Sequence, residues 1–366
     1  MKLLVLSDAN SIHTQKWVFS LNNEGFNVHL FSLFKPNDEI AKLYINSGIN
    51  VSTIDIKHRI RHIRNADISK LIYISSIPKL KQIIKSFSPQ IIHAHYASSY
   101  GVLAYLLKFH PFILSFWGSD IYDFPQKNIF NKWIMKRVIK SADCICSTSM
   151  AMKKIIINDY NRKNVNLIPF GVDTNKFIPK IVKGNGFRIG TIKSIESHNG
   201  IDCLLDAASK LAKDKRYSEI QFDIIGKGSL LNQMKEKTKK LGIEKHVKFS
   251  GHISHENIEK HYQKLSIFVA VSTKESFGVS IVEAAACGVP AITSNVGGLP
   301  EVNNDNKTGF VIQPNDPQTL AELVIKLYNN EELRKELGVN ARNMAIQKFD
   351  WKTSVQKMIK IYNQYI

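Results

Sequence analysis

The sequence has few cysteines, no long hydrophobic run and no two aspartates separated by a single residue. Its four cysteines, Cys144, Cys146, Cys203 and Cys287, are scattered through apolar segments. This spacing excludes a disulfide framework or a zinc site and predicts buried thiols in a reducing compartment. No apolar stretch approaches the ~18 residues of a membrane span, and the N-terminus turns polar at Ser7, too early for a signal peptide. We therefore expect a cytoplasmic protein, either free or peripheral on the inner face of the cell membrane.

Acidic residues are also scarce. The chain has 50 Lys and Arg against 31 Asp and Glu, a formal charge of +19, and the excess lies in the first half: 24 against 11 in residues 1–180, but 26 against 20 in residues 181–366. Such a half attracts phosphates of nucleic acids, of anionic lipids or of a diphosphate-linked acceptor. In residues 57–85, eight basic residues accompany one aspartate, Asp67, among apolar side chains. This composition suits an amphipathic surface resting on anionic lipid, and a solvated basic face is the alternative.

The length of 366 residues favours two domains. In both halves, short apolar runs alternate with longer helix-like stretches, a pattern typical of an α/β fold with parallel, doubly wound sheets. The predicted strands of the first half are residues 2–6, 27–33, 50–54, 90–95, 112–116, 143–148 and 165–168. Those of the second half are residues 187–192, 221–225, 247–250, 267–271, 291–294 and 310–312. The polar stretch at 180–186 between the two series predicts a first domain of residues 1–175 and a second of 176–349.

The most informative stretch is residues 272–301, STKESFGVSIVEAAACGVPAITSNVGGLPE. It follows a predicted strand and contains a predicted helix at 278–287 and a second strand at 291–294, which together make a βαβ unit. Glu283 lies in this helix among apolar neighbours, where a carboxylate costs several kcal/mol unless it is hydrogen-bonded. A ribose diol is one suitable partner. The alternative is that residues 280–283 form a capping box.

Glu275 stands in the loop before this helix. The backbone N–H groups of Phe277, Gly278 and Val279 at the helix start would be unpaired and able to hold an anion. Together with Glu283, they outline a site for a sugar nucleotide. The alternative is that Glu275 is an ordinary solvated residue of the loop.

The pair Glu275 and Glu283, spaced as Glu-x7-Glu, is followed by Gly288-x-Pro290 and Gly297-Gly298-x-x-Glu301. This set resembles the donor site of the family 4 glycosyltransferases. The resemblance implies the GT-B fold, two facing Rossmann-like domains with a C-terminal helix, here within residues 350–366, that crosses back to the first domain. It also implies that Glu283 holds the ribose hydroxyls, that Glu275 contacts the transferred sugar and that Phe277-Gly278 faces the diphosphate.

A departing nucleoside diphosphate needs its growing negative charge stabilised. Metal-dependent glycosyltransferases of the other common fold use an Asp-x-Asp pair, which this chain lacks, so we expect fixed positive groups and neither a metal nor another cofactor. Relatives place an Arg and a Lys after the first strand of the second domain, and here those places fall on Lys193 and His198. Gly226, after another strand, either brings backbone close to the nucleotide or forms a plain turn. His252 lies where relatives contact the base through backbone groups, which leaves the base unidentified.

The first half is expected to bind the acceptor. Its first loop follows a strand, where open α/β sheets place ligands. The loop lacks the Gly-Gly of many relatives but resembles a subset with Asp-x-x-Ser-x-His-x-x-x-Trp, here Asp8, Ser11, His13 and Trp17. His13 is expected to hydrogen-bond a phosphate or hydroxyl, and helix capping is the alternative.

Two further strand ends contribute candidates. His93 and His95 share one face of a strand, so a two-ligand metal site is conceivable, but ligand binding by His95 and a satisfied core position for His93 are favoured. Trp117 occupies the place where the family often has a histidine near the transferred sugar. Because Trp117 cannot move a proton, we expect Asp120 or His95 to take the polar role that this histidine has near the transferred sugar. Trp117 is expected to pack against a sugar face.

These observations predict a retaining, metal-independent glycosyltransferase. It would move a hexose or N-acetylhexosamine from a nucleotide sugar, a UDP-sugar before others, to a glycan or lipid-linked acceptor in bacterial surface polysaccharide synthesis. In retaining relatives the leaving diphosphate takes the acceptor proton on the same sugar face, so no enzymatic nucleophile is needed. The alternatives are a sugar-nucleotide epimerase or a phosphorylase of the same fold and, more remotely, a basic nucleic-acid-binding protein.

Overall fold

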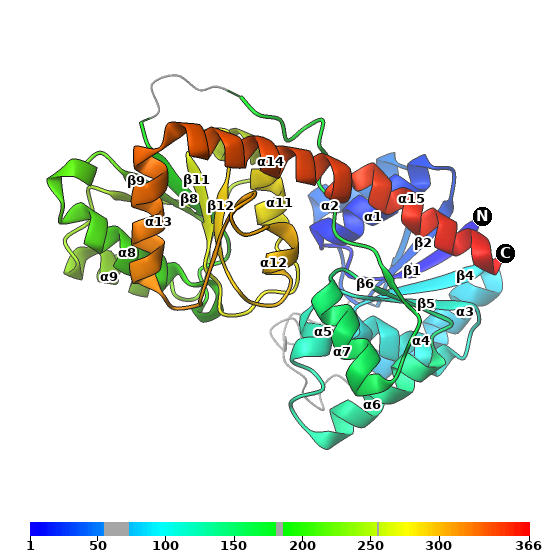
Figure 1. Ribbon diagram of the computed structural model, residues 1–366. Helices are drawn as coiled ribbons and strands as arrows, with labels where there is room; N and C mark the ends of the chain where they lie inside the picture. The colour runs from blue at the N-terminus through cyan, green and yellow to red at the C-terminus, as the bar shows by residue number, and fades with distance from the viewer. Residues whose placement is uncertain (55–72, 181–185, 255) are drawn as a thin grey trace. The chain divides into compact units, whose positions relative to one another are not determined.

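The computed structural model describes residues 1–54, 73–180, 186–254 and 256–366 (Figure 1). The chain forms two compact units: unit 1 comprises Met1–Pro169 and Val355–Ile366, and unit 2 comprises Phe170–Ser354. Most of the basic segment predicted at 57–85 and most of the crossing predicted at 180–186 lie outside the described residues. No described helix combines the length and hydrophobicity that a membrane crossing requires.

Unit 1 is built on a seven-stranded sheet in the order β3-β2-β1-β4-β5-β6-β7. Every neighbouring pair is parallel. Its strands are β1 (Lys2–Leu6), β2 (Asn27–Ser32), β3 (Asn50–Thr53), β4 (Ile91–His95), β5 (Phe112–Phe116), β6 (Cys144–Ser147) and β7 (Val165–Leu167). The central strands β4 and β5 are buried along their whole length, as expected for a parallel sheet covered on both faces. All seven strands predicted from apolar runs are therefore confirmed.

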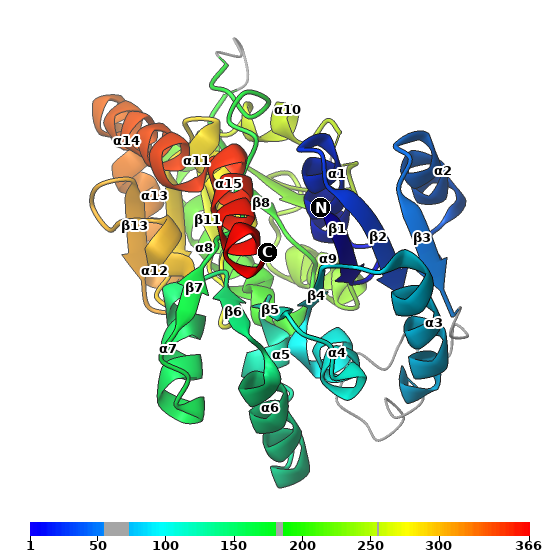
Figure 2. The ribbon, with the colours of Figure 1, turned by 90° about the vertical axis from the view of Figure 1, so that its right-hand side faces the viewer.

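Helices cover the two faces of this sheet (Figure 2). They are α1 (Ile12–Asn23), α2 (Asp38–Asn46), α3 (Ile77–Phe87), α4 (Val102–Leu107), α5 (Ser119–Tyr122), α6 (Ile129–Ser141) and α7 (Met150–Tyr160). Side chains of Asn37, Asn128 and Ser149 accept N–H bonds at the starts of α2, α6 and α7, which explains where these helices begin. The last helix, α15 (Trp351–Tyr362), joins unit 1 from Val355 onward.

Unit 2 repeats the arrangement with a six-stranded parallel sheet in the order β10-β9-β8-β11-β12-β13. Its strands are β8 (Arg188–Ile192), β9 (Gln221–Ile225), β10 (Val247–Gly251), β11 (Ile267–Ala270), β12 (Ala291–Ser294) and β13 (Gly309–Ile312). Its helices are α8 (Ile201–Ala212), α9 (Leu231–Lys240), α10 (Glu259–Tyr262), α11 (Val279–Ala286), α12 (Leu299–Val302), α13 (Pro317–Asn329) and α14 (Glu331–Phe349). The six predicted strands are confirmed, and the chain has an α/β fold of two doubly wound units.

All four cysteines are buried and free, as their scattered positions predicted. Cys144 and Cys146 lie on β6, two residues apart, so their side chains share one face of the sheet.

Candidate functional site

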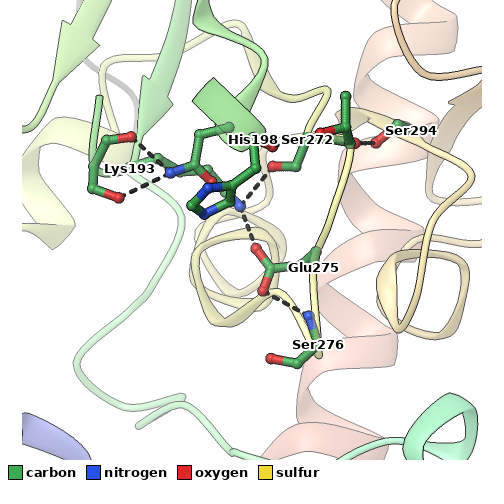
Figure 3. Close-up of polar contacts among 9 residues, drawn as sticks. Lys193, His198, Ser272, Glu275, Ser276 and Ser294 are labelled. Atoms are coloured by element: carbon green, nitrogen blue, oxygen red, sulfur yellow. Dashed lines mark hydrogen bonds and ion pairs between the residues drawn. The ribbon is translucent and has the colours of Figure 1, made fainter. Parts of the chain in front are cut away.

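Three polar side chains meet at the carboxyl edge of the unit 2 sheet. Lys193 directly follows β8, while Ser272 and Glu275 follow β11, and these two strands are neighbours. The Lys193 ammonium donates a hydrogen bond of 3.0 Å to Ser272 Oγ and forms an ion pair with Glu275 Oε2 (Figure 3). The Lys193 side chain is 7% exposed and that of Glu275 is 21% exposed. A fixed positive charge is therefore held where open α/β sheets bind ligands.

The Glu275 carboxylate is stabilised in its charged form. Burial raises the pKa of Glu275, but the Lys193 ammonium and the backbone N–H groups of Ser276 and Phe277 outweigh this effect, so the net shift is downward. The N–H of Ser276 donates to Oε1 over 3.0 Å. The loop N–H of Phe277, which the sequence suggested as an anion ligand, thus stabilises a carboxylate of the protein itself.

Glu283 is buried, at 7% exposure, on helix α11. Its Oε2 accepts a hydrogen bond of 2.7 Å from the hydroxyl of Tyr262, which belongs to α10. The helix begins after Gly278, whose φ of +100° fits glycine, so Ser280 is a helical residue and residues 280–283 are not a capping box. The alternative considered for this segment is therefore wrong, and Glu283 is a buried carboxylate with a hydroxyl partner.

Two glycines allow the loops of this site to approach closely. Gly226 has a φ of +153°, and a Cβ there would overlap the carbonyl oxygen of Lys193. Gly297 has a φ of +50°, and a Cβ there would overlap the carbonyl oxygen of Glu275. Only glycine meets both conditions, since other residues rarely adopt positive φ and all carry a Cβ. A glycine is thus required at position 226, because the loop that carries Lys193 packs directly against it.

The remaining donor candidates lie around this centre in different ways. The ring of Phe277 is 2% exposed and packs edge-on against Phe349, with centroids 5.7 Å apart, so its backbone is the part available to a ligand. His198 is exposed in a short turn, and its carbonyl accepts the N–H of Thr273 over 2.8 Å. His252 is exposed after β10, and Val279 is the first residue of α11. Their roles toward a nucleotide stay predictions.

In unit 1, three of the predicted residues form an aromatic cluster. The rings of His95 and Trp117 are stacked with centroids 4.5 Å apart, and the ring of His13 meets Trp117 edge-on at 5.9 Å. These residues come from the ends of β4 and β5 and from the start of α1. Burial, with the nearby His93 and His13, lowers the pKa of His95, so this imidazole is neutral at pH 7. The structure therefore brings together residues that the sequence places more than 20 positions apart.

The first loop is held by its own polar side chains. Asp8 Oδ1 accepts the backbone N–H of Asn10 over 3.0 Å. Ser11 precedes the first residue of α1 without a side-chain capping bond. His13 is the second helical residue and does not cap α1, so that alternative is wrong.

His93 is a satisfied core histidine. Its Nδ1 lies 2.6 Å from the hydroxyl of Tyr362 on α15, and its Nε2 lies 2.8 Å from Ser115 Oγ. Burial lowers the pKa of His93 to about 3. Among the described residues, no group of three His, Cys, Asp or Glu side chains is placed to hold a metal ion.

Asp120 supports the loop that carries Trp117. Its fully buried carboxylate accepts backbone N–H bonds from Ala97 at 2.9 Å, Gly118 at 2.8 Å and Trp117 at 3.3 Å. Burial raises the pKa of Asp120 to about 6, against the lowering effect of these donors. The contacts make Asp120 a positioning residue, and its expected polar role toward a ligand stays a prediction.

The side chains that hydrogen-bond to the candidate residues were not predicted from the sequence. Ser272 could have been found, because it directly follows a predicted strand as Lys193 does. Tyr262 and Tyr362 carried no such signal, since each lies in a polar helical segment and acts through a hydroxyl on a residue distant in sequence.

Comparison with protein families gives two matches that together span most of the chain. Residues 173–344 match the family model described as "Glycosyl transferases group 1". Residues 2–149 match the one described as "Glycosyl transferase 4-like".

A curated relative and two solved structures match nearly the whole length of the chain. An uncharacterized glycosyltransferase of Methanocaldococcus jannaschii is 29% identical over 359 residues, 97% of this chain and 94% of its own. A crystal structure of a glycosyltransferase from Rickettsia africae has a TM-score of 0.82 at 21% identity, covering 100% of this chain and 98% of that one. HepE of Anabaena, solved in complex with UDP, has a TM-score of 0.82 at 18% identity and 100% coverage of both chains. These structural similarities show the fold.

Proposed function

The chain belongs to the group 1 glycosyltransferases and has the GT-B fold, and we propose that it transfers a hexose or N-acetylhexosamine from a nucleotide sugar to a glycan or lipid-linked acceptor. A UDP-sugar is the first candidate for the donor, since HepE has been crystallised with UDP and with UDP-glucose. The process we propose is bacterial surface polysaccharide synthesis at the inner face of the membrane.

The observation that carries this proposal is the group of Lys193, Ser272 and Glu275 at the carboxyl edge of the unit 2 sheet. When the bond between the anomeric carbon and the diphosphate oxygen breaks, negative charge grows on the diphosphate. A buried ammonium that is already fixed in place stabilises that charge without reorganisation. We assign this role to Lys193, with His198 as a second candidate on the same loop.

The two glutamates have separate roles in this proposal. Glu283 has one oxygen bound to Tyr262, and we propose that its carboxylate also accepts hydrogen bonds from the ribose diol. Glu275, which pairs with Lys193, would contact the transferred sugar at the boundary between sugar and diphosphate. The start of α11 adds the positive end of a helix dipole to this part of the site.

The acceptor would be bound by unit 1, through Trp117, His95 and His13. A stacked indole offers a flat apolar surface that suits a sugar face. We propose a retaining reaction. The acceptor oxygen forms its bond to the anomeric carbon on the face from which the diphosphate leaves, and the departing diphosphate oxygen takes the acceptor proton. The protein then contributes mainly orientation and charge stabilisation.

The test is a thermal-shift panel with UDP, GDP, ADP and their common sugar conjugates, with and without EDTA. A ligand at about 100 times its dissociation constant adds roughly 2.7 kcal/mol to the stability of the folded state. We expect one nucleotide to stabilise the wild type in the presence of EDTA, and to stabilise Glu283→Gln much less. The exposed Glu336→Gln serves as the matched control and should respond as the wild type does.

Product analysis then separates the alternatives. A glycosyltransferase yields a new glycoside and a free nucleoside diphosphate. An epimerase would yield an isomeric sugar without a second sugar acceptor, and a phosphorylase would require inorganic phosphate. If no nucleotide stabilises the wild type, the donor site assigned here is wrong.

A further inference from the structure

Helix α6 exposes an apolar cluster that the donor and acceptor sites do not use. Ile129, Phe130 and Trp133 are 87%, 54% and 51% exposed, and the rings of Phe130 and Trp133 are stacked with centroids 6.1 Å apart. The opposite face of α6 is anchored in unit 1 by the buried residues Asn131, Met135, Val138 and Ile139. The cluster is therefore held on a fixed helix and does not belong to the core.

Cations surround this cluster. Lys132, Lys136, Arg137 and Lys140 are all exposed on α6, and the helix contains no acidic residue. The Arg137 guanidinium lies 5.2 Å from the centroid of the Trp133 ring. Because the helix repeat is 3.6 residues, Ile129, Trp133, Lys136 and Lys140 fall on one side of the helix. Asp123 is the acidic residue nearest in sequence before α6, and it is only partly exposed.

We propose that this face of α6 docks unit 1 on a bilayer surface rich in anionic phospholipid. The amphipathic ring of Trp favours the boundary between head groups and acyl chains, and Phe and Ile supply apolar area that can insert there. Lys and Arg attract the lipid phosphates. At 13 residues α6 is about 20 Å long, too short to cross a ~30 Å hydrocarbon core, so the helix would lie in the plane of the interface.

The position of α6 in the fold relates this surface to the acceptor residues. The helix begins twelve residues after Trp117 and follows β5, so its aromatic N-terminal end lies toward the carboxyl edge of the unit 1 sheet. Figure 2 shows α6 on the outside of unit 1. A lipid-linked acceptor anchored in the same bilayer would be delivered close to that edge. This inference deepens the proposed membrane association and rests on it, but not on the identity of the donor.

The test is co-sedimentation of the full chain with vesicles of phosphatidylcholine alone or mixed with phosphatidylglycerol. We expect binding to the mixed vesicles that weakens with salt. The double variant Phe130→Ser/Trp133→Ser should bind at least about tenfold more weakly, because it removes the inserted apolar area. The variant Lys132→Gln/Lys136→Gln should lose about fivefold for each cation removed.

Matched controls remove equivalent side chains elsewhere. Val339→Ser/Ile346→Ser changes two exposed apolar residues of α14, and Lys239→Gln/Lys240→Gln changes two exposed lysines of α9. Both controls should bind vesicles as the wild type does. The emission of Trp133 should shift to the blue on binding, and Trp133→Phe should lose this shift while it still sediments with vesicles.

Three results would overturn the inference: equal binding to neutral and anionic vesicles, equal loss in the controls, or a concentration-dependent dimer that Phe130→Ser/Trp133→Ser abolishes. The last result would make the cluster an interface between two copies of the chain. The nucleotide-induced thermal shift of each variant is measured in parallel. A variant of α6 that no longer binds vesicles but keeps the nucleotide-induced shift has lost membrane binding alone. Loss of the shift in the wild type would instead count against the proposed function.

Discussion

The hydroxyl of Tyr262 donates a 2.7 Å hydrogen bond to Oε2 of Glu283, which links α10 to the buried part of α11. Burial, and then the charge of Glu283, raise the pKa of Tyr262, so the phenol remains a donor throughout the physiological range. The bond satisfies one lone pair of a carboxylate that would otherwise be costly to bury. It also fixes the rotamer of the side chain that we assign to the ribose.

Tyr262→Phe should destabilise the protein by about 1–3 kcal/mol, because the buried Glu283 carboxylate loses a donor. Nucleotide affinity should fall as well, but less than in Glu283→Gln, since the carboxylate remains. Urea unfolding followed by circular dichroism and calorimetric titration with the nucleotide measure the two effects. Tyr328→Phe, a partly buried tyrosine packed on Phe187 and Tyr217, is the control. Equal losses in both tyrosine variants would contradict a specific role for the bond.

Gly226→Ala should reduce nucleotide affinity more than it reduces stability. The added Cβ would overlap the carbonyl of Lys193 and must displace the loop that positions the ammonium. Gly242→Ala is the control, because Gly242 also has a positive φ, +68°, but has open space around it. It should cost about 1 kcal/mol of stability and leave affinity unchanged. Similar affinities for the two variants would contradict the close-approach explanation.

The fold was largely predictable because its strands are buried on both faces. Continuous apolar runs such as 112–116 and 291–294 mark such strands directly, and their alternation with helical stretches leaves few topologies. The start of α11 was predicted within one residue, since Gly278 and Gly288 bound it. Glu283 could be selected as a candidate because a carboxylate inside an apolar helix conflicts with its local environment.

The contacts within the site were not predictable in the same way. Lys193 and Glu275 are 82 positions apart, and their pairing depends on β8 and β11 being neighbours in the sheet. The sequence suggested that the N–H groups of Phe277, Gly278 and Val279 would hold a ligand anion, but it did not show that the Glu275 carboxylate accepts from one of them, that of Phe277. Tertiary packing decides which partner a polar group meets, and periodicity carries no information on it.

A double-mutant cycle on Lys193 and Glu275 should reveal a strong coupling. Lys193→Met leaves a partly buried carboxylate without its cation and should cost roughly 3 kcal/mol, the order found when one partner of a buried pair is removed. Lys193→Met/Glu275→Gln should recover part of that loss. Nucleotide affinity should fall in both Lys193 variants, since the ammonium is absent from each. Additive effects on stability, or unchanged affinity in Lys193→Met, would contradict the roles assigned to the pair.

The stability of unit 1 should fall as the pH drops below 6.5, partly because of His93. Burial lowers the pKa of His93 from 6.5 to about 3, so between these values the unfolded chain binds a proton that the folded chain does not. Stability therefore rises with pH in this window, by about 1.4 kcal/mol per pH unit for one histidine, and is level above it. Below pH 6.5, His93→Gln should reduce the slope by about that amount, although it also weakens the contacts to Tyr362 and Ser115.

Urea unfolding at several pH values between 4.5 and 7.5 checks whether the stability rises with pH in this window. Tryptophan fluorescence reports mainly on unit 1, because Trp17, Trp117 and Trp133 belong to it. The exposed His252→Gln is the control and should leave the slope unchanged. An unchanged slope in His93→Gln would mean that His93 can accept a proton in the folded protein. In that case, the bond from His93 to Tyr362 on α15 would be a charged contact, and acid would strengthen the attachment of the C-terminal helix.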